Sequence, residues 1–196
     1  MAATKAQVRA EIVAVRRSLS RQTRDAEAAA LERRLTAAVA PATTICAYVP
    51  VGSEPGSVAL IDSAAGRGVT VLLPVAREGA DGVPLPLLWG EHIPGDLVAA
   101  PFGLREPPPP WLPADAVARA SMVFVPALAV DRDGVRLGRG AGYYDRTLTK
   151  AAPGALLIAV VRDAELVETL PSEPHDVLMT HALTPGQGLV ALNRHR

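Results

Sequence analysis

The stretch that decides the expected fold covers residues 121–146, SMVFVPALAVDRDGVRLGRGAGYYDR. Its apolar first half, SMVFVPALAV, predicts a buried strand, and the residues from about 143 to 151 predict a helix. The turn between them contains three alternating glycines, Gly138, Gly140 and Gly142. Glycine takes positive φ and lets backbone N–H groups approach a ligand closely. A strand that leads through such a turn into a helix suits a phosphate group, because unpaired N–H groups and the positive helix end face it.

Side chains in the same turn allow more than one interpretation. Arg136, Arg139 and Arg146 add fixed positive charge, yet a mobile glycine-rich surface loop would have a similar composition. No lysine follows the glycines as a Walker A loop requires, and GxGxG late in the chain is not the dinucleotide fingerprint GxGxxG. Asp145 either holds a Mg²⁺ that bridges phosphates or only favours the helix dipole.

The segments around this turn alternate between strand and helix patterns. TTICAYVPV (43–51), GVTVLLPVA (68–76) and ALLIAVVR (155–162) predict strands, and residues 58–65 predict a helix. This alternation predicts a three-layer α/β/α domain with a mainly parallel sheet, in which ligands bind beyond the carboxyl ends of the strands. We expect one domain over residues 1–196, with N-terminal helices within 1–40 packing on the α/β body.

The N-terminal segment predicts a basic amphipathic helix over residues 4–19, followed by a second helix that Ser20 caps. On a helical wheel, Lys5, Arg9 and Arg16 lie directly beside the apolar stripe. Two explanations remain open at this point. The cations either reach into a cleft formed with the rest of the domain, or cover apolar surface with their long aliphatic stems.

Composition excludes several classes of protein. The 196 residues contain 20 basic and 20 acidic side chains, so no net field attracts nucleic acid or a membrane surface. No apolar stretch is long enough to cross a bilayer and no signal peptide is visible, so we expect a cytoplasmic protein with neither nucleic-acid nor membrane partners. The single cysteine and the spacing of the four histidines predict neither a disulfide nor a zinc site. We expect a monomer or a weak homo-oligomer.

The motif VRLGRGAGYYDR after FVPALAVDRDG, together with KAQVR near the N-terminus, resembles the 5-formyltetrahydrofolate cyclo-ligase (5,10-methenyltetrahydrofolate synthetase) family. The resemblance covers nearly the whole chain. It implies an ATP- and Mg²⁺-dependent conversion of 5-formyltetrahydrofolate to 5,10-methenyltetrahydrofolate, ADP and phosphate. In this reaction the formyl oxygen is phosphorylated and N10 then attacks the activated carbon, so no covalent enzyme nucleophile is needed.

The resemblance also implies roles for individual residues. Arg139 is the expected catalytic residue, because a guanidinium can bind two oxygens of the transferring phosphoryl group. Asp145 and Asp176 are the implied magnesium ligands. The implied ATP-binding residues are Lys5, Arg9, Arg136, Leu137, Gly138, Arg139, Gly140, Ala141, Gly142, Tyr143 and Tyr144. The implied folate-binding residues are Val49, Glu54, Phe102 and Tyr143, where a carboxylate suits the donor-rich edge of a pterin and aromatic rings can stack on it.

The sequence departs from the family pattern at a few positions. Thr180 stands where relatives often carry a second acid, which leaves one carboxylate and water for metal binding there. Ala141 replaces Gly or Lys, and Phe102 is also compatible with an ordinary loop anchor. The proline-rich segment 106–113 is expected to be a rigid crossover within the domain, rather than a recognition segment. The main alternative function is a non-catalytic nucleotide- or phosphometabolite-binding module on the same scaffold. An RNA-binding protein that uses the basic arm fits less well.

Overall fold

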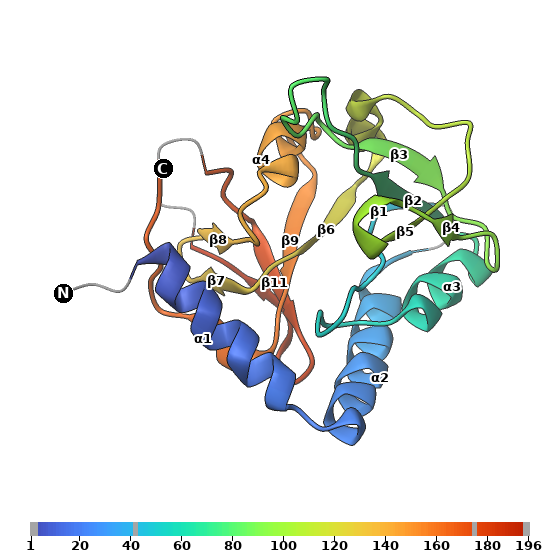
Figure 1. Ribbon diagram of the computed structural model, residues 1–196. Helices are drawn as coiled ribbons and strands as arrows, with labels where there is room; N and C mark the ends of the chain where they lie inside the picture. Colours follow the sequence, from blue (N-terminus) through green and yellow to red (C-terminus); the bar gives the residue numbers. More distant parts are fainter. Residues whose placement is uncertain (1–3, 41–42, 174–175, 194–196) are drawn as a thin grey trace.

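A computed structural model describes residues 4–40, 43–173 and 176–193 of the protein and shows a seven-stranded sheet at its centre (Figure 1). The strands follow the order β12-β11-β9-β6-β1-β2-β3. Their bounds are β1 Thr44–Cys46, β2 Thr70–Val75, β3 Leu88–Glu91, β6 Met122–Pro126, β9 Leu156–Val160, β11 His181–Thr184 and β12 Gly188–Ala191. The five central strands are parallel to one another, whereas β3 and β12 pair antiparallel at the edges. The mainly parallel sheet expected from the sequence is confirmed.

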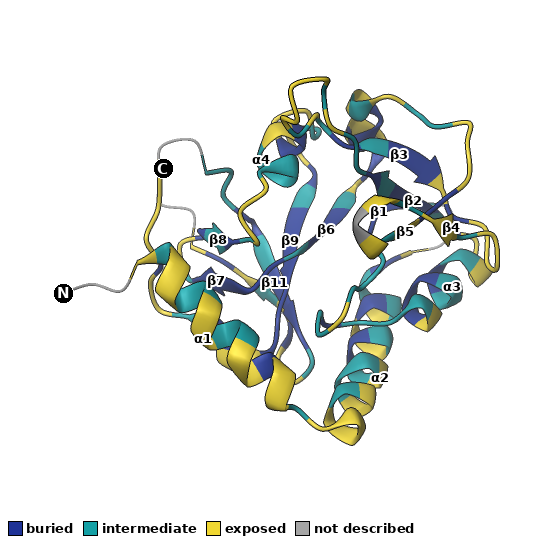
Figure 2. Cartoon of the chain, in the orientation of Figure 1, coloured by how far each residue is buried: buried dark blue, intermediate teal, exposed yellow. Residues whose placement is uncertain are grey.

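Both faces of this sheet are covered, which explains why its central strands are buried almost throughout (Figure 2). Successive side chains of a strand face opposite sides, so Ile45 packs in one core cluster and Cys46 in the other. On one face lie α2 (Arg21–Ala38) and α3 (Val58–Gly66). On the other lie the 3₁₀ helix η2 (Ala114–Arg119) and α4 (Tyr143–Leu148). The expected three-layer arrangement is therefore present.

A second, three-stranded sheet receives the N-terminal helix α1 (Lys5–Ser18). Its strands are β7 (Ala129–Asp131), β8 (Arg136–Leu137) and β10 (Leu166–Val167). Val8 and Ile12 of α1 pack against the apolar cluster on this sheet, and Figure 1 shows the helix beside β7. A capping box between Thr4 and Gln7 begins the helix at Lys5. The basic amphipathic helix was predicted correctly; the sequence did not indicate that a small second sheet would be its packing partner.

The apolar run SMVFVPALAV is two strands rather than the single strand we expected. β6 ends at Pro126 and β7 begins at Ala129, with a short break between them. The Arg16 guanidinium lies at this break, where its Nη2 donates to the carbonyl oxygens of Ala127 at 2.7 Å and Leu128 at 3.4 Å. Hydrogen bonds from a buried arginine thus occupy the carbonyl groups at this break, and sequence periodicity does not reveal such a contact.

Two other segments are shorter than predicted. The strand expected over 43–51 is only β1, and the following residues leave the sheet. The helix expected to reach residue 151 ends at Leu148, so α4 has only six residues and a small helix dipole. The proline-rich segment 106–113 is joined to the edge strand β3, because the backbones of Trp89 and Leu112 exchange hydrogen bonds of 3.0 and 2.7 Å.

Candidate active site

A cavity of about 540 Å³ lies beyond the carboxyl ends of the central strands β1, β2 and β6, where α/β sheets bind their ligands. Its volume is within the range of small-molecule sites. One wall consists of the glycine turn (residues 138–142) and the adjoining residues of β8, α4 and α1. The opposite wall consists of the loop after β1 (residues 48–54) and the end of β2.

The glycine turn has the backbone freedom that its sequence indicated. Gly140 and Gly142 have φ angles of 102° and 79°, a region that other residues rarely adopt. Within the described part of the chain, no amide of residues 138–142 donates a hydrogen bond to another protein group. The Arg9 side chain lies against this turn and donates from Nε to the Gly138 carbonyl at 2.9 Å. The turn therefore presents free N–H groups and an adjacent cation to the cavity.

The base of the turn is held by a buried arginine. Arg136 Nη2 donates to Asp145 Oδ1 at 2.8 Å, and the Arg136 side chain is only 7% exposed. Its Nη1 donates to the Pro126 carbonyl at 3.4 Å. Arg136 also lies over the Tyr144 ring, with Cζ 5.7 Å from the ring centroid. These contacts connect the end of β6 to the start of α4, so they fix where the turn enters the cavity.

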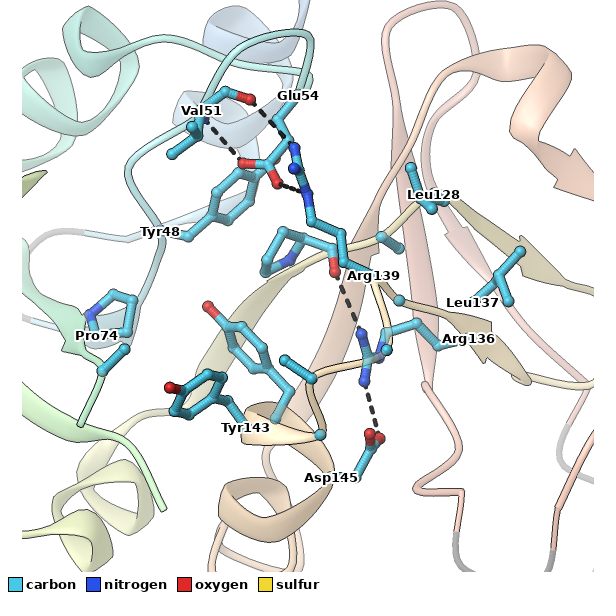
Figure 3. A pocket seen from close by; sticks show the side chains of 18 of the residues that line it. Tyr48, Val51, Glu54, Pro74, Leu128, Arg136, Leu137, Arg139, Tyr143 and Asp145 are labelled. Atoms are coloured by element: carbon cyan, nitrogen blue, oxygen red, sulfur yellow. Dashed lines mark hydrogen bonds and ion pairs between the residues drawn. The ribbon is translucent and has the colours of Figure 1, made fainter. Parts of the chain in front are cut away.

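An ion pair joins the two walls across the cavity (Figure 3). Arg139 Nε donates to Glu54 Oε1 at 3.0 Å, and its Nη2 donates to the Val51 carbonyl at 3.4 Å. The other carboxylate oxygen of Glu54 accepts a hydrogen bond from the Val51 amide at 2.9 Å. Glu54 is 10% exposed, whereas Arg139 is 60% exposed. The carboxylate is thus held in place by its own loop, while the arginine is accessible to a ligand.

Aromatic side chains line the space between the walls. The Tyr144 hydroxyl is buried and has no hydrogen-bond partner among the described residues. Burial, with the charge of Glu54, raises its pKa, although Arg136 acts in the opposite direction. Burial and the nearby Glu78 carboxylate also raise the pKa of Tyr143, whose hydroxyl lies 3.5 Å from Glu78 Oε1. Both tyrosines therefore keep their protons at neutral pH and can act as hydrogen-bond donors.

The two predicted metal ligands line the same cavity, and each is paired with a cation. Asp145 binds Arg136, and Asp176 Oδ2 lies 3.0 Å from Lys5 Nζ. Lys5 also lies 3.3 Å from Glu173 Oε2. Among the described residues, no group of three or more His, Cys, Asp or Glu side chains is arranged to hold a metal ion. A metal would therefore need oxygen ligands from a bound ligand or from water besides these carboxylates.

The structure brings the predicted site residues together. Every implied ATP, folate or metal residue other than Phe102 lines this cavity, including Val49, Leu137 and Ala141. The Phe102 side chain is outside the described part of the structure, although its backbone lies in the 3₁₀ helix η1 (Pro101–Gly103). Lys5 and Arg9 reach into the cleft, which resolves the two explanations left open for these cations.

Sequence reasoning missed several residues of the lining. Arg16, the third member of the cationic row, is almost fully buried and binds Glu165 with two hydrogen bonds of 2.7 Å. Only its place beside the apolar stripe of the helix could have indicated burial, and basic residues that merely cover apolar surface with their aliphatic stems occupy the same place. The other missed residues carry no motif and come from several segments; they include Tyr48, Pro74, Leu87, Leu104 and Arg105.

Two residues that raised questions in the sequence do not line the cavity. Burial raises the pKa of the Cys46 thiol, which disfavours the thiolate a nucleophile requires. The Thr180 hydroxyl is buried and pairs with the amide and carbonyl of Leu157 at 2.9 and 3.0 Å. Thr180 therefore supports the junction between neighbouring strands.

None of the helices in the described residues has the length and apolar character of a membrane-spanning segment.

Comparisons with known proteins agree with this geometry. The profile of the 5-formyltetrahydrofolate cyclo-ligase family matches residues 1–185. A 5-formyltetrahydrofolate cyclo-ligase from Mycolicibacterium smegmatis is 59% identical over 96% of this chain and 97% of its own length. The Escherichia coli enzyme of that name is 30% identical over 76% of this chain and 81% of its own.

Solved structures show the same fold. The 5,10-methenyltetrahydrofolate synthetase of Aquifex aeolicus superposes with a TM-score of 0.75 at 23% identity, over 98% of this chain and 94% of that one. The synthetase of Mycoplasma pneumoniae gives a TM-score of 0.67 at 18% identity, over 89% and 94% of the two chains. From the sequence match and the arrangement of the cavity together, the chain belongs to the 5-formyltetrahydrofolate cyclo-ligase family.

Proposed function

We propose that the protein converts 5-formyltetrahydrofolate to 5,10-methenyltetrahydrofolate with ATP and Mg²⁺, releasing ADP and phosphate. One observation supports this function above the others. The glycine turn holds free amides and the Arg9 and Arg139 guanidinium groups toward a cavity large enough for small-molecule ligands. Free backbone donors beside fixed cations are the groups that bind a polyphosphate.

The reaction has two steps and needs no covalent enzyme intermediate. The formyl oxygen on N5 attacks the γ-phosphorus of ATP, and the bond to the β-phosphate oxygen breaks to release ADP. N10 then attacks the activated formyl carbon, and phosphate leaves with the former formyl oxygen. The protein must therefore place the two substrates together and stabilise charge during phosphoryl transfer. The absence of a reactive thiolate at Cys46 is consistent with this chemistry.

Arg139 is the proposed catalytic residue. Its side chain is the most accessible cation on the glycine turn, and its fork can bind two oxygens of the transferring phosphoryl group. Arg9 and Lys5 reach the cavity from α1 and extend the positive surface along the phosphates. Arg136 acts mainly by positioning the turn, because its guanidinium is buried between Asp145 and the Pro126 carbonyl.

Glu54 is the proposed pterin ligand on the opposite wall. A pterin presents several N–H donors along one edge, and the Glu54 carboxylate is already oriented by the Val51 amide. Val49 and Tyr143 supply apolar and aromatic surface for the ring. Phe102 is proposed as a further contact on the basis of the family resemblance alone.

The carboxylates of the cavity fit a magnesium ion by their chemistry. Mg²⁺ is typically bound in such sites by one or two carboxylates together with phosphate oxygens and water, and Asp145 and Asp176 supply two carboxylates from separate segments. When bound, the ion would neutralise phosphate charge. Lys5 and Arg136 hold these carboxylates in the structure described here, so metal binding requires that at least part of this pairing be released.

A spectrophotometric assay tests the proposal. The purified protein is mixed with 5-formyltetrahydrofolate, ATP and Mg²⁺, and the near-ultraviolet absorbance of the methenyl product is followed. We expect product only when all three components are present. The alternative, a non-catalytic binding module, predicts that the protein binds nucleotide but not the folate in calorimetry, and that it forms no product.

A further inference from the structure

The charged side chains of the cavity are mostly paired with one another. Three of the lining cations have carboxylate partners within the lining itself: Lys5 with Asp176, Arg136 with Asp145, and Arg139 with Glu54. A fourth, Arg16, binds the buried Glu165 behind the cavity. These four cations are each compensated by a carboxylate of the protein.

Two lining guanidinium groups have no carboxylate partner among the described residues, Arg9 and Arg105. Each donates to a single carbonyl oxygen, Arg9 to Gly138 at 2.9 Å and Arg105 to Leu97 at 3.2 Å. Arg9 lies at the glycine turn, on the wall proposed to bind phosphate. Arg105 lies in β5 (Arg105–Glu106), which pairs with β4 (Val98–Ala99), and Figure 1 shows this pair of strands across the molecule from α1 and β8. The uncompensated positive charges therefore mark two separate parts of the cavity.

The hairpin that carries Arg105 is held firmly in place. Glu106, the next residue, is buried and receives two hydrogen bonds from Arg77, at 2.6 and 2.8 Å. Arg77 in turn stacks on Trp111, with Cζ 4.3 Å from the ring centroid. Since successive residues of a strand face opposite sides, anchoring Glu106 to Arg77 leaves Arg105 free to face a ligand.

Apolar residues share the cavity lining with this arginine. Leu104 precedes it in the chain, and Leu87 and Pro74 line the same cavity. A ligand that fits here has an apolar or aromatic body and ends in an anion. A folate has that chemistry, because its aminobenzoyl group leads to a glutamate with two carboxylates.

We propose that Arg105 binds the glutamate carboxylates of the folate, so that the β4–β5 hairpin is the subsite for the substrate's tail. This inference rests on the proposed cyclo-ligase function. Arg105 is a binding residue and takes no part in phosphoryl transfer. Polyglutamylated folates carry more carboxylates, so the same residue would favour them over the monoglutamate.

The test compares Arg105→Ala with the wild-type protein on two substrates. One is 5-formyltetrahydrofolate, and the other is its pteroate analogue, which lacks the glutamate. Because Arg105 is exposed, we expect the substitution to raise the KM for the folate about three- to fivefold. The KM for ATP and the KM for the pteroate analogue should stay unchanged. A triglutamate substrate should show a larger penalty than the monoglutamate.

Two further variants make the outcome decisive. Arg105→Lys keeps the charge and should recover part of the lost affinity. Arg119→Ala removes another exposed arginine, at the end of η2 and outside the cavity lining, and should behave like the wild type. An equal penalty on both substrates would mean that Arg105 acts only on the shape of the hairpin, and no penalty on either would also overturn the proposal. A wild-type protein without turnover would contradict the cyclo-ligase function itself.

Discussion

The two walls of the cavity are built in opposite ways. The loop after β1 satisfies its own polar groups: Glu54 accepts from the Val51 amide, and the Tyr48 hydroxyl donates to the Pro55 carbonyl at 2.7 Å. The glycine turn leaves the amides of residues 138–142 without acceptors in the described protein. Backbone groups that a fold leaves unpaired beside a cavity are available to a ligand. The glycine turn therefore has hydrogen-bond donors available for an anion, whereas the loop after β1 is a preformed surface.

The largest effect should come from removing the buried Arg16 contacts that hold α1 against the body of the domain. Arg16→Ala leaves Glu165 without its main cationic partner, and breaking a buried pair in this way costs about 3–5 kcal/mol. Because the Arg162 amide still donates to Glu165, we expect the lower end of that range. Chemical denaturation measures the loss, and the exposed neighbour in Arg17→Ala is the control. A free energy of unfolding equal to that of the wild type would show that the packing of α1 does not depend on these contacts.

The next largest effect is expected from the accessible cation of the turn. Arg139→Ala should lower kcat by a factor of about 10²–10³, the typical loss when one charge-stabilising donor is removed. The fold should stay intact, since the side chain is largely exposed. Steady-state kinetics and thermal unfolding check the two parts, with Arg132→Ala, outside the cavity lining, as the control. A kcat within twofold of the wild type would remove Arg139 from the phosphoryl-transfer step.

A substitution in the opposite wall should alter the KM for a substrate rather than kcat. Glu54→Gln keeps the shape of the side chain but removes the charge, and a hydrogen bond to a charged group contributes about 1.5–3 kcal/mol. We expect the KM for the folate to rise by more than the KM for ATP. Equal shifts of the two constants would mean that Glu54 does not belong to the folate wall.

The smallest effect tests the internal order of that loop. Tyr48→Phe removes the hydrogen bond to the Pro55 carbonyl, which should lower the free energy of unfolding by about 1 kcal/mol. Tyr144→Phe is the matched comparison, because its hydroxyl is also buried but has no partner in the described protein. The stability of that variant should be equal to or above that of the wild type. The reverse order of the two stabilities would contradict the contrast between the walls.

Much of the fold and of the cavity lining was predictable because local patterns carried the information. Apolar runs marked the parallel strands, and the glycines, arginines and tyrosines of residues 136–144 marked the cavity wall that is proposed to bind phosphate. The rest depended on contacts between distant segments. The break between β6 and β7 coincides with the contact of Arg16 with the Ala127 and Leu128 carbonyls. Arg105 lines the cavity because Glu106 beside it pairs with Arg77. The hydrophobic periodicity of a single segment cannot predict contacts between residues that are distant in the sequence.

The Arg139–Glu54 ion pair has a consequence for how the two substrates influence each other. Each partner of the pair is proposed to contact a different substrate, so in that scheme whichever ligand arrives first releases the group that the second one needs. The free-energy cost of breaking the ion pair is then incurred only once for both ligands. Linkage makes this cooperation reciprocal: if the nucleotide tightens folate binding by some factor, the folate tightens nucleotide binding by the same factor. The ion pair should therefore lower the affinity for ATP when no folate is bound.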